Sequence, residues 1–267
     1  MNFHVISCME KALGQSLLHG VVERAYKKKR FSVNFLNPRD FTSDVHQTID
    51  DRPFGGGDGM LMMAEPMAQG LERVLSKASG PVLMLSPQGK RWSDSWARQL
   101  SQEADVTLIC ARYGGVDQRF LNAYPVQEVS IGDYVLSGGE LAAAVLMDSV
   151  IRLLPGVLGH DQSAHQDSFA HRGLLEAPHF TRPRLWRDME VPPVFLQGHH
   201  KKINGYKEKL SWLVTLQKRP DLLAEVEIPH RELQGFLQTL EKSETQALGL
   251  DRETLQSTLG KIAQEAD

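Results

Sequence analysis

The first two thirds of the chain alternate short apolar runs with longer amphipathic stretches. Runs rich in β-branched and aromatic residues predict strands at 3–7, 31–36, 82–86, 106–111 and 126–129. Apolar residues at helical spacing predict helices at 15–28, 94–102 and 140–153, and Glu65-Pro66 starts another, since proline suits the first helical turn. This alternation predicts an α/β fold, a mostly parallel sheet with helices on both faces.

The pattern changes after Pro155-Gly156, which stop the last of these helices. Residues 160–200 are rich in proline and histidine and show little periodicity, which is typical of a linker or a functional loop. From 201 to 267 the apolar residues return to helical spacing. We therefore expect a large domain over 1–159, a linker over 160–200 and a small all-helical domain over 201–267.

The formal net charge of −3 argues against a protein that coats nucleic acid through bulk basicity. Its distribution is uneven, because cations outnumber acids from 199 to 219 and acids outnumber cations from 221 to the end. Lys27, Lys28, Lys29 and Arg30 form a second basic run. Each basic run predicts either a solvated helix face or a local surface for an anionic partner.

The longest uncharged apolar stretch in the middle of the chain, 141–147, is far shorter than the roughly 20 residues that a membrane span needs. The N-terminal residues show no secretory signal pattern. Only Cys8 and Cys110 are present, which excludes a four-cysteine metal site and fits a reducing compartment. We expect a cytoplasmic protein with no membrane contact.

Several glycine-rich loops are candidates for ligand binding. Gly55, Gly56, Gly57 and Gly59 fit neither the P-loop nor the Gly-x-Gly-x-x-Gly pattern, which disfavours a nucleotide triphosphatase or a Rossmann dehydrogenase and leaves a surface loop or a functional loop. Three further loops, 86–89, 112–115 and 131–139, each follow a predicted strand. Ligands of open α/β sheets bind at the carboxyl ends of the strands, so these three loops together predict a cofactor site.

Other catalytic patterns are absent or weak. The histidines of the linker region have neither the i, i+4 spacing of a zincin nor matching cysteines, so we expect no metal site there. No Gly-x-Ser-x-Gly nucleophile elbow occurs. Asp167 follows the helix that carries Arg152, and by position alone it is either a turn residue or a catalytic group.

Nine motifs taken together resemble the bacterial tRNA (guanine-37-N1)-methyltransferase family, TrmD, over residues 1 to about 220. They are NPRDF (37–41), DDRPFGGGDGMLM (50–62), LSPQG (85–89), RYGGVD (112–117), SIGDYVLSGGEL (130–141), RLLPGVLG (152–159), DSFA (167–170), PHFTRP (178–183) and VPPV (191–194). The resemblance implies the SPOUT class, with a trefoil knot at the C-terminal end of the α/β domain that binds S-adenosyl-L-methionine.

The resemblance also implies roles for individual residues. Asp167 would be the general base that removes the N1 proton of guanine, and Arg152 would offset charge on the guanine oxygen. The cofactor would be held by Leu85, Ser86, Pro87, Ala111, Tyr113, Gly115, Ile131, Gly132, Asp133, Tyr134, Val135, Leu136, Gly138 and Gly139.

The implied partner is a tRNA with guanosine at positions 36 and 37. Asp50, Gly55, Gly56, Gly57 and Gly59 would recognise these guanosines, and Lys201, Lys202, Lys207 and Lys209 would contact phosphates of the anticodon stem. The enzyme would be a homodimer in which each site combines the knot of one subunit with the linker of the other.

The chain departs from the family pattern at several positions. Gly114 and Gln166 stand where the family has acids, Ala111 replaces a cofactor-lining glycine, and Asp58 replaces a proline. The family is reported to depend on magnesium, and the loss of two carboxylates leaves that dependence open. Two alternatives follow: a catalytically weak or retargeted SPOUT protein that binds cofactor and RNA, and a nucleotide-cofactor oxidoreductase.

Overall fold

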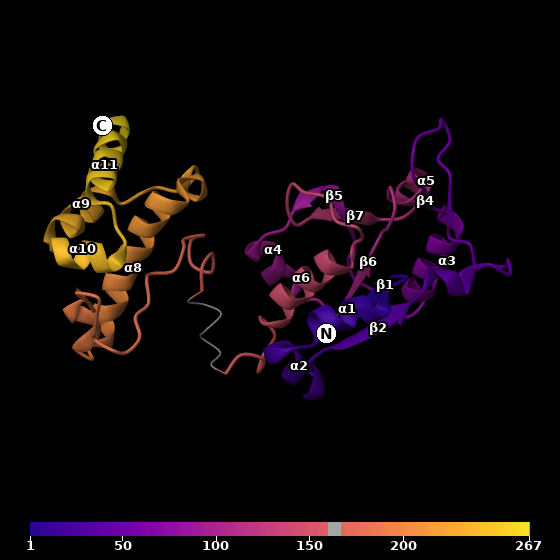
Figure 1. The fold of residues 1–267 in the computed structure, drawn as a ribbon, viewed down its shortest axis with the longest axis horizontal. Helices are drawn as coiled ribbons and strands as arrows, with labels where there is room; N and C mark the ends of the chain where they lie inside the picture. Colours follow the sequence, from indigo (N-terminus) through magenta and orange to yellow (C-terminus); the bar gives the residue numbers. More distant parts are fainter. Residues whose placement is uncertain (160–166, 267) are drawn as a thin grey trace. The chain divides into compact units, whose positions relative to one another are not determined.

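The computed structural model describes residues 1–159 and 167–266. The chain divides into two compact units, Met1–Ala164 and His165–Asp267 (Figure 1). Each unit has its own hydrophobic core, and they are described in turn.

The first unit is built on a five-stranded parallel sheet, which confirms the α/β prediction. Its strands are β1 (Asn2–Ile6), β2 (Ser32–Leu36), β5 (Val82–Arg91), β6 (Asp105–Ile109) and β7 (Val126–Ser130). They lie in the order β2-β1-β6-β5-β7, and Val5 of β1 pairs with Leu108 of β6. Because β6 and β5 stand beside each other and β7 follows β5, the carboxyl ends of these three strands meet at one edge of the sheet.

Helices cover both faces of this sheet (Figure 1). They are α1 (Glu10–Leu17), α2 (Gly20–Lys27), α3 (Ala64–Leu75), α4 (Asp94–Leu100), α5 (Gln118–Ala123) and α6 (Glu140–Ile151), with a 3₁₀ turn η1 (Pro38–Phe41). Leu83 and Leu85 of β5 pack with α1, α4 and α6, whereas Val82 and Met84 pack with α3 and α5. This alternation reflects the two-residue period of a strand, and it explains why β5 is apolar on both faces.

The sequence prediction differs from the structure at two elements that matter for shape. The single helix expected over 15–28 is wrong: α1 ends at Leu17 and α2 starts at Gly20, whose φ of 58° lies in the left-handed region that glycine favours. Strand β5 runs on to Arg91, past the expected end at Ser86. Its pairing with β7 shifts between Leu85 and Lys90, so residues 86–89 bulge out of the strand.

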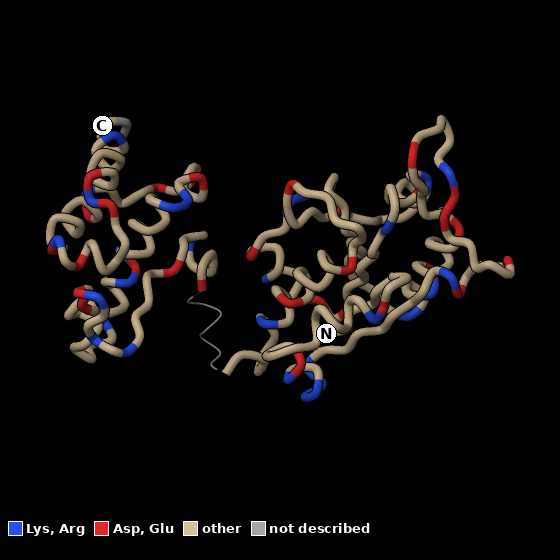
Figure 2. The backbone as a smooth tube through the Cα atoms, in the orientation of Figure 1, with Lys and Arg blue, Asp and Glu red and all other residues tan. Residues whose placement is uncertain are grey.

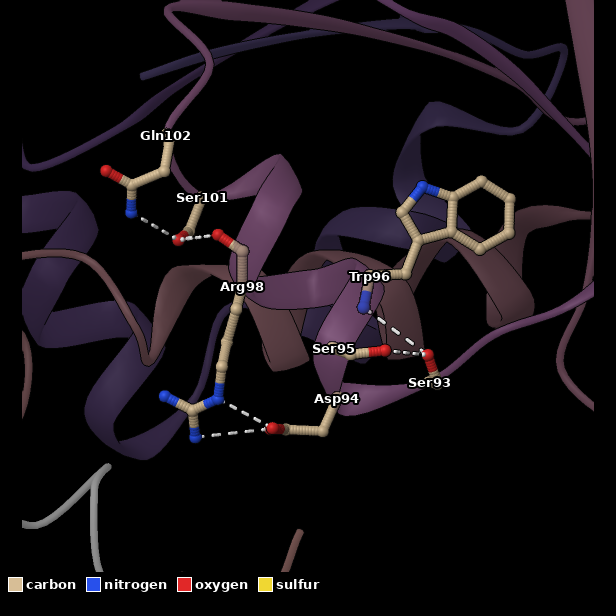
Figure 3. A network of polar contacts seen from close by, with 7 residues as sticks. All are labelled: Ser93, Asp94, Ser95, Trp96, Arg98, Ser101 and Gln102. Carbon is tan, nitrogen blue, oxygen red and sulfur yellow. Dashed lines mark hydrogen bonds and ion pairs between the residues drawn. The ribbon is translucent and has the colours of Figure 1, made fainter. Parts of the chain in front are cut away.

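Helix α4 shows how local side chains fix the start of a helix (Figure 3). The Ser93 hydroxyl accepts a hydrogen bond from the Trp96 backbone N–H, at 3.3 Å, and thereby caps the helix. One turn further on, Arg98 Nε donates to the Asp94 carboxylate at 2.6 Å. The helix leads the chain back along the sheet, from the carboxyl end of β5 to the amino end of the parallel strand β6.

The second unit is mostly helical, which confirms the expected helical C-terminal region. Its elements are β8 (Leu185–Trp186), β9 (Met189–Glu190), η2 (Pro193–Leu196), α8 (His200–Lys218), η3 (Pro220–Leu223), α9 (His230–Thr239), α10 (Lys242–Leu248) and α11 (Arg252–Ala266). Leu210 and Leu213 of α8 form its core with Leu237 and Leu259, and Leu174, from the expected linker, packs against them. Across the described residues, no helix combines the length and apolar character required to cross a membrane.

Candidate functional site

A pocket of about 470 Å³ opens at the carboxyl ends of β5, β6 and β7. It is lined by nearly all residues that the sequence assigned to a cofactor: Leu85, Ser86, Pro87, Ala111, Tyr113, Gly115, Ile131, Gly132, Tyr134, Val135, Leu136, Gly138 and Gly139. Its volume lies in the range of small-molecule sites, roughly 300–1,000 Å³. The three loops that the sequence singled out therefore converge on one cavity.

The first loop, 86–89, is the bulge in β5. Gly89 lies so close to β7 that a Cβ atom on it would come within 2.2 Å of the Val129 backbone nitrogen. Ser86 Oγ accepts a hydrogen bond from the Gln88 N–H at 3.1 Å and turns the chain. A larger residue than glycine at position 89 would push the strands apart, so the bulge and its pocket wall depend on Gly89.

The second loop, 111–116, connects the pocket to a neighbouring hairpin. Its Gly114 N–H donates to Met60 O and its Gly115 carbonyl accepts from Met62 N–H, both at 2.9 Å. Tyr113 adopts φ 58° and lines the pocket with about half of its surface exposed. Main-chain bonds to the hairpin therefore hold this loop, and its buried Val116 side chain and the ion pair of Arg112 with Glu140 add to them.

The third loop, 131–139, returns from β7 to the end of β6. Gly139 N–H donates to Ala111 O at 3.0 Å, and a Cβ atom on Gly139 would lie 2.8 Å from Cys110 Cα. This contact requires glycine at 139, and burial there raises the pKa of the Cys110 thiol well above its usual value. The loop then enters α6.

Asp133 is the one predicted cofactor residue that does not line the pocket. Its side chain is 91% exposed and lies 4.0 Å from an Arg91 guanidinium nitrogen. Its carboxylate points to solvent and not into the pocket. The neighbouring residues of the third loop can still line the pocket, because loops of this kind contact a ligand through their backbone.

A buried polar network at the pocket floor was missed by the sequence analysis. Glu140, only 4% exposed at the start of α6, accepts a hydrogen bond from Ser7 Oγ at 2.8 Å and pairs with Arg112 NH1 at 3.3 Å. Arg112 lines the pocket and bridges to Gly138 through its backbone. A carboxylate directly before the long apolar run 141–147 of this helix was the available signal.

The hairpin that carries the glycine run joins β3 (Asp50–Asp51) to β4 (Leu61–Met62). Gly55, Gly56, Gly57 and Gly59 all have positive φ, between 80° and 120°, and no heavy atom lies within 4 Å of where a Cβ would stand. Glycine is needed there for backbone conformation rather than for packing. Because Asp50 pairs with Met62, the base of the hairpin is attached to the second pocket loop.

The two predicted catalytic residues belong to different units. Arg152 follows the last turn of α6, and its N–H donates to Asp148 O at 3.2 Å. Asp167 opens the described part of the second unit, where its carbonyl accepts from Ala170 N–H and the chain turns back toward Leu174. The neighbouring Gln166, His160 and His165 lie outside the described residues.

The predicted RNA-binding lysines share helix α8. Lys201 and Lys202 are exposed in its first turn, which contains no acid, and Lys209 pairs with Glu232 at 3.2 Å. Cations at a helix N-terminus oppose the helix dipole, so this arrangement favours an anionic partner. The second basic run, 27–30, gathers at the end of α2 (Figure 2). Among the described residues, no cluster of three His, Cys, Asp or Glu side chains could hold a metal ion.

Comparison with known proteins decides the family. The model of the family "tRNA (guanine-1)-methyltransferase TrmD" matches residues 1–225. This chain belongs to that family. It is 46% identical over 232 residues to a tRNA (guanine-N(1)-)-methyltransferase of Pseudoalteromonas atlantica, covering 86% of this chain and 87% of the relative. The relative from Hahella chejuensis is 45% identical over 234 residues, with 87% and 90% covered. The one from Marinomonas sp. is 43% identical over 247 residues, with 91% and 98% covered.

Membership of the TrmD family confirms the resemblance read from the nine motifs and the predicted enzyme class, and it shows that the oxidoreductase alternative is wrong. The family match ends at residue 225, so α9, α10 and α11 lie beyond it. These three helices pack on α8 through Leu237, Leu248 and Leu259. In this TrmD-family chain they therefore complete the hydrophobic core under the basic helix.

Proposed function

We propose that this TrmD-family enzyme transfers a methyl group from S-adenosyl-L-methionine to N1 of guanosine 37 in tRNA. The observation that carries the proposal is the convergence of the three glycine-bearing loops on one pocket at the carboxyl ends of β5, β6 and β7. In open α/β sheets this edge is where ligands bind.

The lining of the pocket fits this cofactor. Leu85, Ala111, Ile131 and Ala142 offer apolar surface for a purine ring, and the glycines leave main-chain N–H and C=O groups accessible to polar atoms. Gly138 and Gly139 allow the third loop to approach Arg112 and Cys110 closely. When bound, S-adenosylmethionine supplies a methyl group attached to a positively charged sulfur, and the leaving group is the neutral thioether that contains this sulfur.

A SPOUT-type trefoil knot is part of the proposal. Strand β5 lies between β6 and β7, yet the chain leaving β7 returns to the end of β6, where Gly139 bonds to Ala111. The bulge 86–89 lies at this edge too, because Lys90 and Arg91 directly after it pair with Val129 and Ser130 at the end of β7. A knot at this edge requires the chain to thread through such a loop, and knots are very rare among protein folds.

Asp167 and Arg152 carry the chemistry in this proposal. The Asp167 carboxylate would accept the N1 proton of guanine and so leave the lone pair of N1 available as the nucleophile for the methyl group. The Arg152 guanidinium offsets the negative charge that develops on the guanine oxygen. The polar linker 160–200 would bring the base to the cofactor domain, 1–159, of the other subunit in a homodimer.

The hairpin and α8 supply RNA contacts in this proposal. Asp50 and the glycine run at 55–59 would recognise guanosines 36 and 37, since the base of the hairpin is bonded to the second pocket loop. Lys201, Lys202, Lys207 and Lys209 of the helical domain, 201–267, would contact phosphates. Magnesium would act only weakly here, because Gly114 offers no carboxylate beside the pocket.

The proposed base is tested by Asp167→Asn, which keeps the shape of the side chain and removes its basicity. We expect methyl transfer to fall by roughly 10²-fold or more while the Kd for S-adenosylmethionine stays unchanged. Asp188→Asn, at an exposed turn with φ 62° that asparagine tolerates, is the matched control. Near-normal turnover of Asp167→Asn in single-turnover assays on unmodified transcript would show that this aspartate is not the base.

A further inference from the structure

The second unit contains a pocket of its own, of about 590 Å³, and the function described so far uses only Lys207 of its lining. It is formed by the segment 178–184, by Val191, by the 3₁₀ turn η2 and by one side of α8. The lining residues that matter below are Phe180, Arg182, Phe195, Leu196 and Lys207.

An aromatic row forms one wall of this pocket. Phe180 packs against Phe195 with 5.5 Å between ring centroids, and the row continues through Tyr206 to Phe236 at 5.5 and 5.1 Å. Phe180 and Phe195 are only partly buried, and both line the pocket. Partly exposed aromatic rings held rigid by neighbours are the surfaces on which unstacked bases bind.

Cations stand beside the aromatic row. Arg182 is exposed and Lys207 is half-buried, and within residues 1–159 and 167–266 neither forms an ion pair. The other basic side chains of the lining are already engaged, since Arg184 pairs with Glu190 and His179 lies 3.3 Å from Glu176. Arg182 and Lys207 are therefore available for an anionic group.

We propose that this pocket binds one unstacked nucleotide of the tRNA, with its base against Phe180 and Phe195 and its phosphate between Arg182 and Lys207. Neither an apolar ligand nor a simple anion uses both halves of the pocket, whereas a nucleotide does. That the nucleotide belongs to tRNA rests on the proposed function. The pocket is a binding site separate from the one that holds the cofactor.

The two halves of the pocket are tested by separate substitutions. Phe195→Leu removes the ring and keeps apolar bulk, and we expect tRNA binding to weaken by roughly 5- to 20-fold at every salt concentration, the lower part of the range for one stacked base. Lys207→Ala should weaken tRNA binding. It should also reduce the slope of log K against log salt by about one in magnitude, the change that the loss of one phosphate contact produces. Neither change should alter the Kd for S-adenosylmethionine.

Phe236→Leu is the matched control, because Phe236 belongs to the same aromatic row but not to the pocket lining. If thermal unfolding shows the same loss of stability in both leucine variants but only Phe195→Leu weakens tRNA binding, the proposal holds. Equal tRNA affinity of Phe195→Leu and wild type would overturn it. Should wild type bind tRNA through this pocket and yet fail to methylate guanosine 37, the proposed function fails and the pocket assignment stands.

A second experiment does not depend on truncating the core. A photoreactive benzoylphenylalanine in place of Leu196, which is 48% exposed at the rim, should cross-link to one nucleotide of bound tRNA in the full-length protein. Competition by wild-type protein for the same tRNA should remove the cross-link. A cross-link to a second copy of the chain, or none to RNA, would instead show that the pocket is not an RNA site.

Discussion

Replacing Glu140 by glutamine tests whether the buried network at the pocket floor positions the cofactor loops. Glutamine has nearly the same shape, and in one orientation its oxygen still accepts the hydrogen bond from Ser7 Oγ. Its amide nitrogen then takes the place of the carboxylate oxygen that faces Arg112 Nη1, so that two hydrogen-bond donors face each other. In the flipped orientation the amide oxygen faces Arg112 and accepts its hydrogen bond, and the Ser7 hydroxyl hydrogen no longer has an acceptor. In either orientation, one donor of the buried network loses its acceptor.

The size of the effect follows from burial. Removing one partner of a fully buried ion pair costs about 3–5 kcal/mol. Here the Glu140 side chain is 5% exposed but that of Arg112 is 29% exposed, so water can solvate the guanidinium after the change. What is lost is closer to the difference between a charged and a neutral hydrogen bond, about 1–2 kcal/mol. We expect unfolding free energy to fall by this amount.

The functional part of the effect reaches the cofactor through Arg112. Its backbone bridges to Gly138, so a displaced guanidinium disturbs both the second and the third loop. If about 1.4 kcal/mol of the loss appears in binding, the Kd for S-adenosylmethionine rises about tenfold, whereas kcat at saturation changes less. Calorimetry gives the Kd and denaturant titration gives the stability.

Ser7→Ala is the control for this experiment, since it removes the hydrogen bond on the far side of Glu140 and leaves the pair with Arg112 intact. It also removes the acceptor of the Met9 N–H, which bonds to Ser7 Oγ at 2.9 Å. It should destabilise the protein by a similar amount and change the Kd by less than about twofold. If both variants lose stability equally and both bind cofactor like wild type, the network is structural only and the positioning argument is refuted.

Two further predictions address the dimer and the metal. The first uses refolded mixtures of Asp167→Asn with Gly132→Trp, whose indole ring would block the pocket of its own subunit. Activity should return at roughly a quarter of all sites. Heterodimers whose activity stays at background would mean that the aspartate of each subunit serves the cofactor of that same subunit. Gly114→Glu requires its neighbours to shift by a few tenths of an ångström, because its Cβ would lie 3.2 Å from both Leu61 Cδ2 and the Met60 carbonyl oxygen. It should increase the response of activity to magnesium, and an unchanged titration would mean that the departure at 114 is neutral.

The strands and the pocket loops could be predicted because their signals are local. Each strand is a short run rich in β-branched and other apolar residues, and each pocket loop has a glycine shortly after a strand. The break between α1 and α2 has only a weak signal, because a glycine inside an amphipathic run is compatible with a continuous helix, and here its φ of 58° decides.

Contacts between distant segments could not be predicted in this way. Ser7 and Glu140 are 133 positions apart, and the sequence around either residue gives no sign that the two side chains are in contact. The same holds for the hairpin, since the glycine run is visible in sequence but the bond of Met62 to Gly115 is not. Such pairs depend on strand order, which places the end of β1 beside that of β6.

The backbone at Tyr113 supports the view that the second pocket loop serves binding rather than stability. A non-glycine residue with φ 58° is disfavoured by about 1–2 kcal/mol, because its Cβ crowds the following carbonyl oxygen. Glycine would relieve this strain, and Gly114 and Gly115 follow directly. Tyrosine instead presents a half-exposed ring at the pocket, fixed by the bridge from Arg112 to Gly138 on one side and by the bonds from Met60 and Met62 on the other. Strain that surrounding bonds hold in place beside a cavity is characteristic of a ligand site.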